Sequence, residues 1–404
     1  MINYIRLGDV SKIEISSVDK KIKENESKVK LCNFTDVYKN WAINKDMIPT
    51  FTMASATSKE KQRFELKKGQ VAITKDSETR DDIGMATYIA DSLENVLLGY
   101  HCALITPNQD VIYGKYLNAY MNSKCVRKHY ENQASGSGQR YTLTIDAISN
   151  IKIPLIEYTL QQKIGDFFSN IDKKITLNNQ INLELESLAK TIYDYWFLQF
   201  DFPDENGKPY KTSGGKMVWN EEVKREIPEG WTIEQISNIS NLYQPKTISE
   251  KDLDYDGQYY VYGANGIIGK YTKYNHLENE IAICCRGASC GLFLMTQPKS
   301  WITGNSMVVS PTNKQLKEYI YYNLNAKVIG KYITGSAQPQ ITATNLAHMK
   351  IIIPDNNMLK RFNSISLNIR KEIELKFNET QSLIKLRDFL LPLLMNEQVG
   401  FKEE

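Results

Sequence analysis

The chain has 404 residues, 42% of them apolar, and its 50 basic and 47 acidic side chains leave a formal net charge of +3. This length predicts two or more compact cores, and the small net charge does not decide for or against a polyanionic partner. The six cysteines form no C-x-x-C pair, so neither a disulfide framework nor a zinc site is expected. No apolar run approaches the roughly 18 residues of a membrane span, so we expect no membrane contact and a cytoplasmic location.

Residues 1–156 are predicted to form a first globular module. An apolar strand at 71–73 leads into the polar loop "TKDSETRDD" at 74–82, and "GSGQRYTLTIDAISNIKIP" at 136–154 places a second polar loop before another apolar strand. Polar residues of a single loop are most often simply solvated. The second stretch carries more weight because it recurs later in the chain.

A long helix is predicted at 157–198, because proline and glycine become sparse and apolar residues recur at alternating steps of four and three. The seam that these positions define is apolar on both sides of a polar middle, and the residues that we expect to pair are Ile171, Ile175, Asn178, Asn182 and Leu185. Taken alone, one such helix would more often be an amphipathic core helix of a globular bundle.

A turn-rich linker at 199–227 is followed by a second predicted module at 228–356. In that module, "GSAQPQITATNLAHMKIIIP" at 335–354 repeats the earlier stretch, so that Ile341 stands 198 residues after Leu143. We therefore predict two copies of one module.

The repeat extends upstream with looser spacing. Residues 281–283 resemble 71–73, and 231–239 resemble 5–13 in their apolar positions. Diverged loops between the matched stretches would explain why the spacing drifts.

A second long helix is predicted at 357–396, before a tail at 397–404. Its seam is weaker but has the same polar centre, and the residues expected to pair are Ile369, Ile373, Lys376, Thr380 and Leu383. Parallel or antiparallel pairing would each bring polar layers together, and the connecting linker favours antiparallel pairing. The predicted fold is α+β, with two globular mixed α/β modules joined by two long helices that pair as an antiparallel coiled coil about a pseudo-twofold axis.

Catalytic motifs are not found. The chain has no Pro-Pro pair of the kind that adenine methyltransferases use and no Walker loop, and its four histidines have no partner at a telling spacing. Asp204, Glu222 and Lys224 could in principle hold Mg²⁺ for a nuclease, but they lie in the turn-rich linker, where such a match often arises by chance. We predict no catalytic residue, no metal and no cofactor.

Several stretches together resemble the specificity subunit of Type I restriction-modification enzymes, over essentially the whole chain. They are "GQVAITKDSETRDDIGMA" (69–86), "LESLAKTIYDYWFLQFDFPDENGKPYKTSGGKMVWNEEVKREIPEGW" (185–231), "VYGANGIIGKY" (261–271), "WITGNSMVV" (301–309) and "LRDFLLPLLMNEQV" (386–399). The resemblance implies that each module is a target recognition domain that reads one half of a bipartite double-stranded DNA sequence. It also implies that the helices dock two methyltransferase subunits and that restriction and translocase subunits are other chains.

DNA reading requires exposed loop side chains that can contact base edges and phosphates. In the first module we expect these to be Lys75, Ser77, Thr79, Arg80, Ser137, Gln139 and Arg140. In the second module we expect Lys246, Thr247, Arg286, Ser289, Asn305, Ser306, Gln338 and Gln340. Tyr195 and Trp196 are the candidates for contact with the methyltransferase, unless they pack against the second helix of this chain. The alternative function is a non-catalytic coiled-coil scaffold that carries two protein-binding modules.

Overall fold

The computed structural model describes residues 3–136, 140–254, 256–324, 329–335 and 337–402. The chain divides into two compact units, of which the first is built from two separate segments and the second from one continuous segment. Unit 1 is Met1–Asn179 together with Asn378–Glu404, and unit 2 is Gln180–Phe377. Each unit therefore contains one globular module and a part of each long helix.

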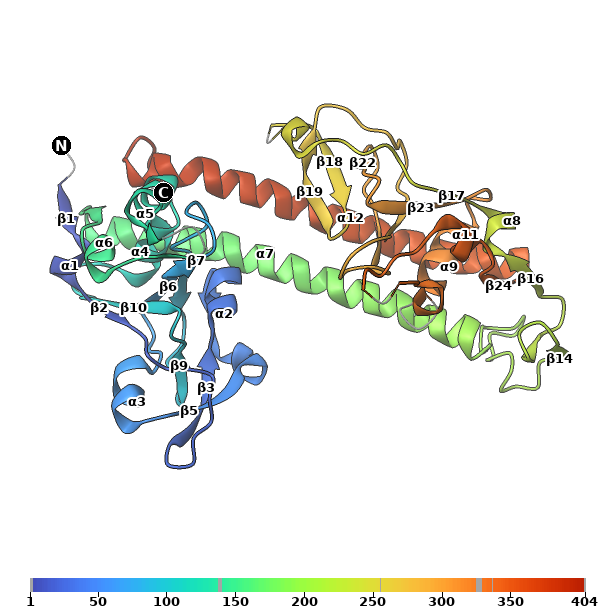
Figure 1. The fold of residues 1–404 in the computed structure, drawn as a ribbon, viewed down its shortest axis with the longest axis horizontal. Coiled ribbons are helices and arrows are strands. Elements are labelled where there is room, and N and C mark those ends of the chain that lie inside the picture. Colours follow the sequence, from blue (N-terminus) through green and yellow to red (C-terminus); the bar gives the residue numbers. More distant parts are fainter. Residues whose placement is uncertain (1–2, 137–139, 255, 325–328, 336, 403–404) are drawn as a thin grey trace. The chain divides into compact units, whose positions relative to one another are not determined.

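Unit 1 is organised by a five-stranded sheet in the order β2-β10-β6-β8-β4 (Figure 1). Every residue of β6 and β8 is buried, which is why these strands are mostly apolar and do not alternate between apolar and polar residues. β10 is antiparallel to both of its neighbours, β2 and β6. The strands of this sheet are β2 (Ser11–Ile15), β4 (Ala42–Ile43), β6 (Val71–Thr74), β8 (Ala86–Ile89) and β10 (Cys102–Pro107).

Three smaller sheets complete unit 1, in the orders β1-β13, β5-β3-β9 and β11-β12-β7. Their strands are β1 (Tyr4–Arg6), β3 (Ser27–Cys32), β5 (Thr52–Ala56), β7 (Asp76–Ser77), β9 (Val96–Leu98), β11 (Ser135–Gly136), β12 (Tyr141–Thr142) and β13 (Lys152–Pro154). The short helices are α1 (Leu7–Val10), α2 (Phe34–Lys39), α3 (Ser58–Phe64), α4 (Gly114–Met121), α5 (Lys124–Gln133) and α6 (Ile145–Ser149).

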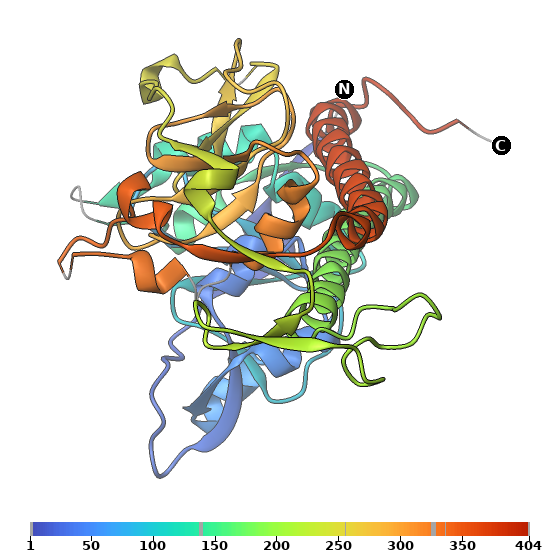
Figure 2. The same ribbon diagram turned by 90° about the vertical axis from the view of Figure 1, so that its right-hand side faces the viewer.

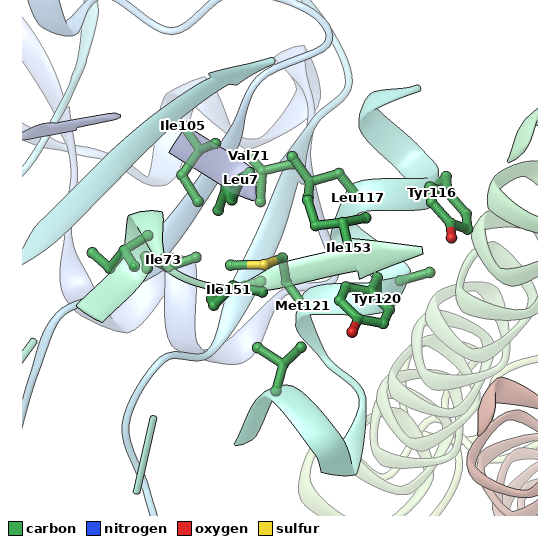
Figure 3. Close-up of a cluster of buried hydrophobic side chains, with 14 of the residues drawn as sticks. Leu7, Val71, Ile73, Ile105, Tyr116, Leu117, Tyr120, Met121, Ile151 and Ile153 are labelled. Atoms are coloured by element: carbon green, nitrogen blue, oxygen red, sulfur yellow. The ribbon is translucent and has the colours of Figure 1, made fainter. Parts of the chain in front are cut away.

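The main core of unit 1 lies between the five-stranded sheet, α4 and the long helices. Figure 3 shows side chains of β6, β10, β13 and α4 that converge there, among them Ile73, Ile105 and Leu117. Each fully buried aliphatic or aromatic side chain contributes roughly 1.5–3 kcal/mol relative to exposure. Gly165 permits a close approach between the first long helix and α4, because a Cβ at this position would lie 2.6 Å from the backbone nitrogen of Tyr116.

Unit 2 contains a four-stranded sheet in the order β17-β23-β20-β21, drawn in yellow to orange (Figures 1 and 2). The other sheets are β19-β18-β22, β16-β24 and the hairpin β14-β15. The strands are β14 (Met217–Asn220), β15 (Arg225–Pro228), β16 (Thr232–Gln235), β17 (Ser240–Tyr243), β18 (Tyr259–Gly263), β19 (Gly266–Tyr271), β20 (Ile281–Cys284), β21 (Phe293–Met295), β22 (Trp301–Ile302), β23 (Ser306–Pro311) and β24 (Lys350–Ile353). The short helices are α8 (Ile236–Ile239), α9 (Leu316–Asn323) and α11 (Ala343–Ala347).

The internal repeat is a repeat of structure. In unit 1, β6 pairs with β10 so that Ile73 faces Ala103, and in unit 2 β20 pairs with β23 so that Ile283 faces Met307. The short helices within the doubled stretch, α6 and α11, also begin alike. The hydroxyl of Thr144 accepts from the backbone nitrogen of Ala147, and that of Thr342 accepts from the backbone nitrogen of Asn345. The match of 281–283 with 71–73 is therefore confirmed.

The match of 231–239 with 5–13 is wrong by three residues. β1 pairs with β13 so that Ile5 faces Ile153, whereas β16 pairs with β24 so that Glu234, not Trp231, faces Ile351. The apolar residues of these stretches recur at steps of about three, so a shift of three residues preserves most of the apolar pattern. Only the strand pairing distinguishes the two registers.

The two long helices are α7 (Tyr158–Tyr193), which continues as a π-helical turn at Asp194–Leu198, and α12 (Asn356–Met395). Neither they nor the shorter helices in the described part of the chain are long and apolar enough to cross a membrane. The ten predicted pairing residues are all buried or half-buried, namely Ile171, Ile175, Asn178, Asn182, Leu185, Ile369, Ile373, Lys376, Thr380 and Leu383.

The contacts inside each unit show antiparallel pairing. In unit 1, Ile164 and Phe168 near the start of α7 share a core with Leu394 near the end of α12. In unit 2, Tyr193 at the end of α7 shares a core with Phe362 near the start of α12. The α+β class, the two repeated modules and the antiparallel helices agree with the sequence prediction.

Candidate nucleic-acid interface

Three loops of unit 1 meet at one edge of its main sheet. Because β10 is antiparallel to β2 and β6, the start of β10 lies beside the ends of the other two strands. The loops that follow β2 and β6 and the loop that precedes β10 are therefore neighbours. They border a hollow of about 640 Å³, whose lining includes Lys20, Lys21, Lys75 and Tyr100.

A small sheet brings the doubled stretch to the same edge. β12 pairs with β7, so that Tyr141 faces Ser77 and Thr142 faces Asp76. The guanidinium of Arg80 lies 5.2 Å from the centre of the Tyr141 ring. Residues 140–142 of the doubled stretch thus lie beside the polar loop at 74–82, although the two were predicted separately from the sequence.

Polar side chains at the centre of this surface hold one another. Lys75 Nζ lies 2.8 Å from Asp76 Oδ1, and His101 Nδ1 lies 2.7 Å from Asp76 Oδ2. Burial alone would raise the pKa of Asp76, but hydrogen bonds from Lys75, Thr142 and His101 outweigh that effect and the pKa lies below its usual value. Asp76 is therefore an ionised acceptor for both neighbours.

Unit 2 builds a similar edge with different side chains. Arg286, which follows β20, forms a β-bridge with Gln340 of the doubled stretch. The loop after β17 joins them, because Gln244 Nε2 donates to Cys285 Sγ at 2.9 Å. Asn305, which precedes β23, accepts through its backbone oxygen from the backbone nitrogen of Cys285 at 3.1 Å.

The same two backbone hydrogen bonds tie the loops together in both units. In unit 1, Lys75 N donates to His101 O at 2.9 Å and Leu143 N donates to Lys75 O at 2.8 Å. In unit 2, Cys285 N donates to Asn305 O at 3.1 Å and Ile341 N donates to Cys285 O at 3.1 Å. The frame is therefore repeated with different side chains, since Lys75 and His101 are half-buried in unit 1, whereas in unit 2 Cys285 is buried and Asn305 is exposed.

Most of the residues predicted to read DNA lie on these two edges, and nine of them are exposed. The exposed residues are Thr79, Arg80, Arg140, Lys246, Thr247, Arg286, Asn305, Gln338 and Gln340. Ser77 and Ser289 are half-buried, and Ser137 and Gln139 lie outside the described residues.

Two predicted residues are less available than expected. Ser306 is only 1% exposed, and its hydroxyl donates to the backbone oxygen of Gly263 at 3.2 Å. The Lys75 side chain is 16% exposed and is paired with Asp76. Ser306 is the first residue of β23 and points into the unit, a direction that its loop-like sequence did not reveal.

The glycine of the doubled stretch closes the loop on itself in both units. A Cβ on Gly136 would lie 2.1 Å from the backbone oxygen of Arg140, and one on Gly335 would lie 2.5 Å from that of Gln338. Gly335 also has a φ of +86°, which favours glycine. The glycine is therefore required by the fold of the loop, whatever the loop binds.

Four residues of the unit 1 edge were not predicted from the sequence. They are Lys20 and Lys21 beside the hollow, and Tyr100 and His101 before β10. Strand pairing reveals the place of His101, because β10 and β23 have the same pairing when shifted by 204 residues (306 − 102), which aligns His101 with the selected Asn305.

The aromatic residues at the end of α7 are not a uniformly exposed cluster. Trp196 is 8% exposed and its ring lies 6.2 Å from that of Phe362 on α12, whereas Tyr195 is 39% exposed. Packing against the second helix of this chain, the alternative considered above, therefore describes Trp196.

No group of three or more His, Cys, Asp or Glu side chains in the described residues could hold a metal ion. The linker carboxylates have other contacts, since Asp204 Oδ1 accepts from two backbone nitrogens of its own turn and Glu222 pairs with Lys350 at 3.0 Å. Hydrogen bonding and ion pairing thus account for these linker carboxylates.

Comparison with known proteins identifies related sequences. A family model described as "Type I restriction modification DNA specificity domain" matches residues 2–187 and 228–375. The Type I restriction enzyme HindI specificity subunit of Haemophilus influenzae is 22% identical over 408 residues, covering 83% of this chain and 87% of that protein. The MjaIX specificity subunit of Methanocaldococcus jannaschii is 22% identical over 326 residues, covering 73% of this chain and 71% of that protein.

A solved structure has a similar fold. The crystal structure of the Type I restriction-modification system S subunit from M. genitalium aligns with a TM-score of 0.56 at 15% identity. The alignment covers 100% of this chain and 97% of that chain.

Proposed function

Because the chain belongs to the family of Type I restriction modification DNA specificity domains, whose model matches both of its repeats, we propose that each unit reads one half of a bipartite DNA target. The observation that carries this proposal is the repeated loop frame. The same backbone hydrogen bonds hold Lys75 and His101 in unit 1 and Cys285 and Asn305 in unit 2. One frame with two sets of side chains is what reading two different half-sites requires.

The exposed groups on each edge suit contacts with duplex DNA. Lys20, Lys21 and Arg140 in unit 1 offer cations for phosphates, which fix position without reading sequence. Arg286 and Gln340 in unit 2 are side chains that can bind guanine and adenine edges with two hydrogen bonds. The net charge of +3 for the whole chain gave no indication of these local basic groups.

In this proposal the chain recognises DNA and performs no chemistry itself. Two methyltransferase subunits supply methyl transfer, and restriction and translocase subunits supply cleavage and movement along DNA. A DNA-recognition subunit acts where the DNA of the cell lies, so the cytoplasmic location belongs to the same proposal.

Docking of the methyltransferase is assigned to the long helices and to Tyr195. Tyr195 is exposed, whereas Trp196 and Phe197 are buried within unit 2. Tyr195→Ser is expected to weaken co-purification with the methyltransferase without lowering the melting temperature. Trp196→Ser is the matched control, because loss of a buried side chain should lower the melting temperature of the chain alone.

The test of DNA recognition is binding of the purified chain, with and without its methyltransferase partner, to random duplex DNA over a salt series. DNA recognition predicts affinity that falls steeply as salt rises, because bound cations of the DNA are released on binding. A scaffold with two protein-binding modules predicts no such affinity. Sequencing of methylated adenines in cells that carry both proteins would then give the two half-sites and their spacing.

A further inference from the structure

His101 lies directly before β10, among the loops that form the unit 1 edge. Its side chain is 19% exposed, and its ring centre lies 3.7 Å from that of Tyr100. Its backbone oxygen accepts from Lys75 N, the contact that Asn305 makes with Cys285 N in unit 2. His101 therefore occupies the position of a residue already selected for DNA contact on independent grounds.

Asp76 fixes which nitrogen of the His101 ring carries the proton. The carboxylate of Asp76 is 2.7 Å from His101 Nδ1 and is also paired with Lys75. An ionised carboxylate only accepts hydrogen bonds, so Nδ1 is the donor. In the neutral ring, Nε2 then carries a lone pair and can only accept.

The Nε2 atom is available to a ligand. Within the described residues, the side chain of His101 makes one hydrogen bond, from Nδ1 to Asp76. Its Nε2 atom makes none and is not among the buried polar atoms without a partner, so it is open to solvent. A phosphate offers no donor to such an atom. The exocyclic amines of adenine (N6) and cytosine (N4) do, and both lie in the major groove.

We propose that His101 is a base-contacting residue of unit 1 whose Nε2 accepts a hydrogen bond from an exocyclic base amine, and that Asp76 is the positioning residue that sets this polarity. The inference rests on the proposed function, because it names the chemistry by which one half-site is read. Lys75 has a role in it, since its charge balances that of Asp76 and leaves no net negative charge beside the DNA.

The first experiment compares methylation-site preferences of the complete complex with wild-type chain and with His101→Ala. The variant is expected to lose about tenfold preference at one base pair of one half-site and to leave the other half-site unchanged. Asn305→Ala is the matched control and should affect only the other half-site. An equal loss at every position, or no change at any position, would overturn the proposal.

A base analogue tests the amine itself. At the affected position, the adenine or cytosine is replaced by an analogue that lacks only the exocyclic amine. The wild-type complex should lose about as much affinity as His101→Ala loses on the natural site, whereas the His101→Ala complex should lose no more on the analogue. Independent, additive losses would show that His101 contacts something else.

Asp76→Asn tests the positioning role with a readout that a purely structural residue would not move. An amide can donate to Nδ1, which would place the proton on Nε2 and turn the acceptor into a donor. The preferred base at the same position should therefore change, while the melting temperature is measured to confirm that the variant folds. A folded variant with unchanged preference would refute the assignment to Asp76.

These outcomes separate the inference from the proposed function. If the wild-type complex selects no bipartite DNA sequence, DNA recognition by this chain fails. If it selects such a sequence and His101→Ala leaves both half-sites unchanged, only the role of His101 fails.

Discussion

Asp172 of α7 is a half-buried carboxylate in unit 1 whose partial burial works against the fold at neutral pH. Burial raises the pKa of Asp172 to about 6, although the charge of Arg387 opposes this shift. An unfolded Asp has a pKa of about 4, so the folded state binds the proton more tightly. The contribution of Asp172 to stability is therefore greatest at low pH and falls as pH rises from about 4 to about 6.

Asp172→Asn is accordingly expected to raise the melting temperature at pH 8, where the carboxylate is ionised, and to have a smaller effect at pH 4.5. Differential scanning calorimetry at both values measures this difference. Asp110→Asn is the control, because Asp110 is exposed in the same unit and should change neither value. A rise of equal size at both pH values would show that ionisation is not the cause.

Residue identity alone predicted the location of the candidate site better than it predicted which side chains are free. Polar residues after an apolar strand indicated the right loops, yet Ser306 is buried and Lys75 is paired with Asp76. The first outcome depends on which residue of β23 faces inward. The second depends on the placement of Asp76, whose other partner, His101, is 25 residues away in the chain. A single sequence contains no direct record of such contacts.

Arg370 connects three helical segments within unit 2. Its guanidinium pairs with Glu186 of α7 at 2.6 Å and with Glu318 of α9 at 3.2 Å, and the Glu318 side chain is 3% exposed. Removing one member of a buried ion pair leaves the other charged and without compensation, which costs about 3–5 kcal/mol.

Arg370→Ala is therefore expected to lower the free energy of unfolding by about that amount, measured by urea denaturation. Adding Glu318→Gln should recover part of the loss, because the uncompensated charge is then removed. Lys314→Ala is the matched control, since Lys314 pairs with Glu278 at the surface with its side chain 76% exposed. A similar loss in the control would mean that burial does not determine the effect.

The polar layer between α7 and α12 fixes the alignment of the two helices at a cost in the stability of the fold. Asn178 Nδ2 donates to Glu379 Oε2 at 3.0 Å and to Thr380 Oγ1 at 3.4 Å, yet the Oδ1 atoms of Asn178 and Asn182 are buried with no hydrogen-bond partner in the described structure. A buried acceptor without a partner costs roughly 1–3 kcal/mol.

Replacing Asn178 and Asn182 with Leu is expected to raise the melting temperature, because the seam of α7 becomes apolar and the two unpaired acceptors are removed. The same change should loosen the fixed distance between half-sites, which a methylation-site survey would detect as variable spacing. A melting temperature that is lower by many degrees would instead show that the two hydrogen bonds of Asn178 stabilise more than its unpaired oxygen costs.

Among the secondary-structure elements, the sequence predicted those that are long enough to show a periodic pattern of apolar residues. Both long helices follow from a heptad seam of many positions, whereas two-residue strands such as β7 (Asp76–Ser77) and β12 (Tyr141–Thr142) are too short to have a period. The three-residue error at 231–239 has the same origin, because a pattern that repeats every three residues fits two registers equally well.

The molecule as a whole is one module used twice, and its first compact unit is completed by a distant part of the chain. Unit 1 takes Leu391, Leu394 and Met395 of α12 into its core. Antiparallel pairing makes this arrangement necessary, since the end of the second helix lies beside the start of the first. Chain order alone therefore could not define the compact units, although the repeat predicted that there would be two modules.

If the two modules read separate half-sites, their loops should be separable in function. Arg80 and Arg140 are exposed on unit 1, and Arg286 and Gln340 are exposed on unit 2. Replacing the first pair with Ala is expected to weaken or relax recognition of one half-site by about 1–3 kcal/mol for each lost base contact and to leave the other intact. Replacing the second pair should do the reverse. A methylation-site survey of both double variants measures this, and equal loss at both half-sites would contradict the assignment of one half-site to each unit. A uniform loss of affinity with a smaller salt dependence would instead identify the replaced cations as phosphate contacts.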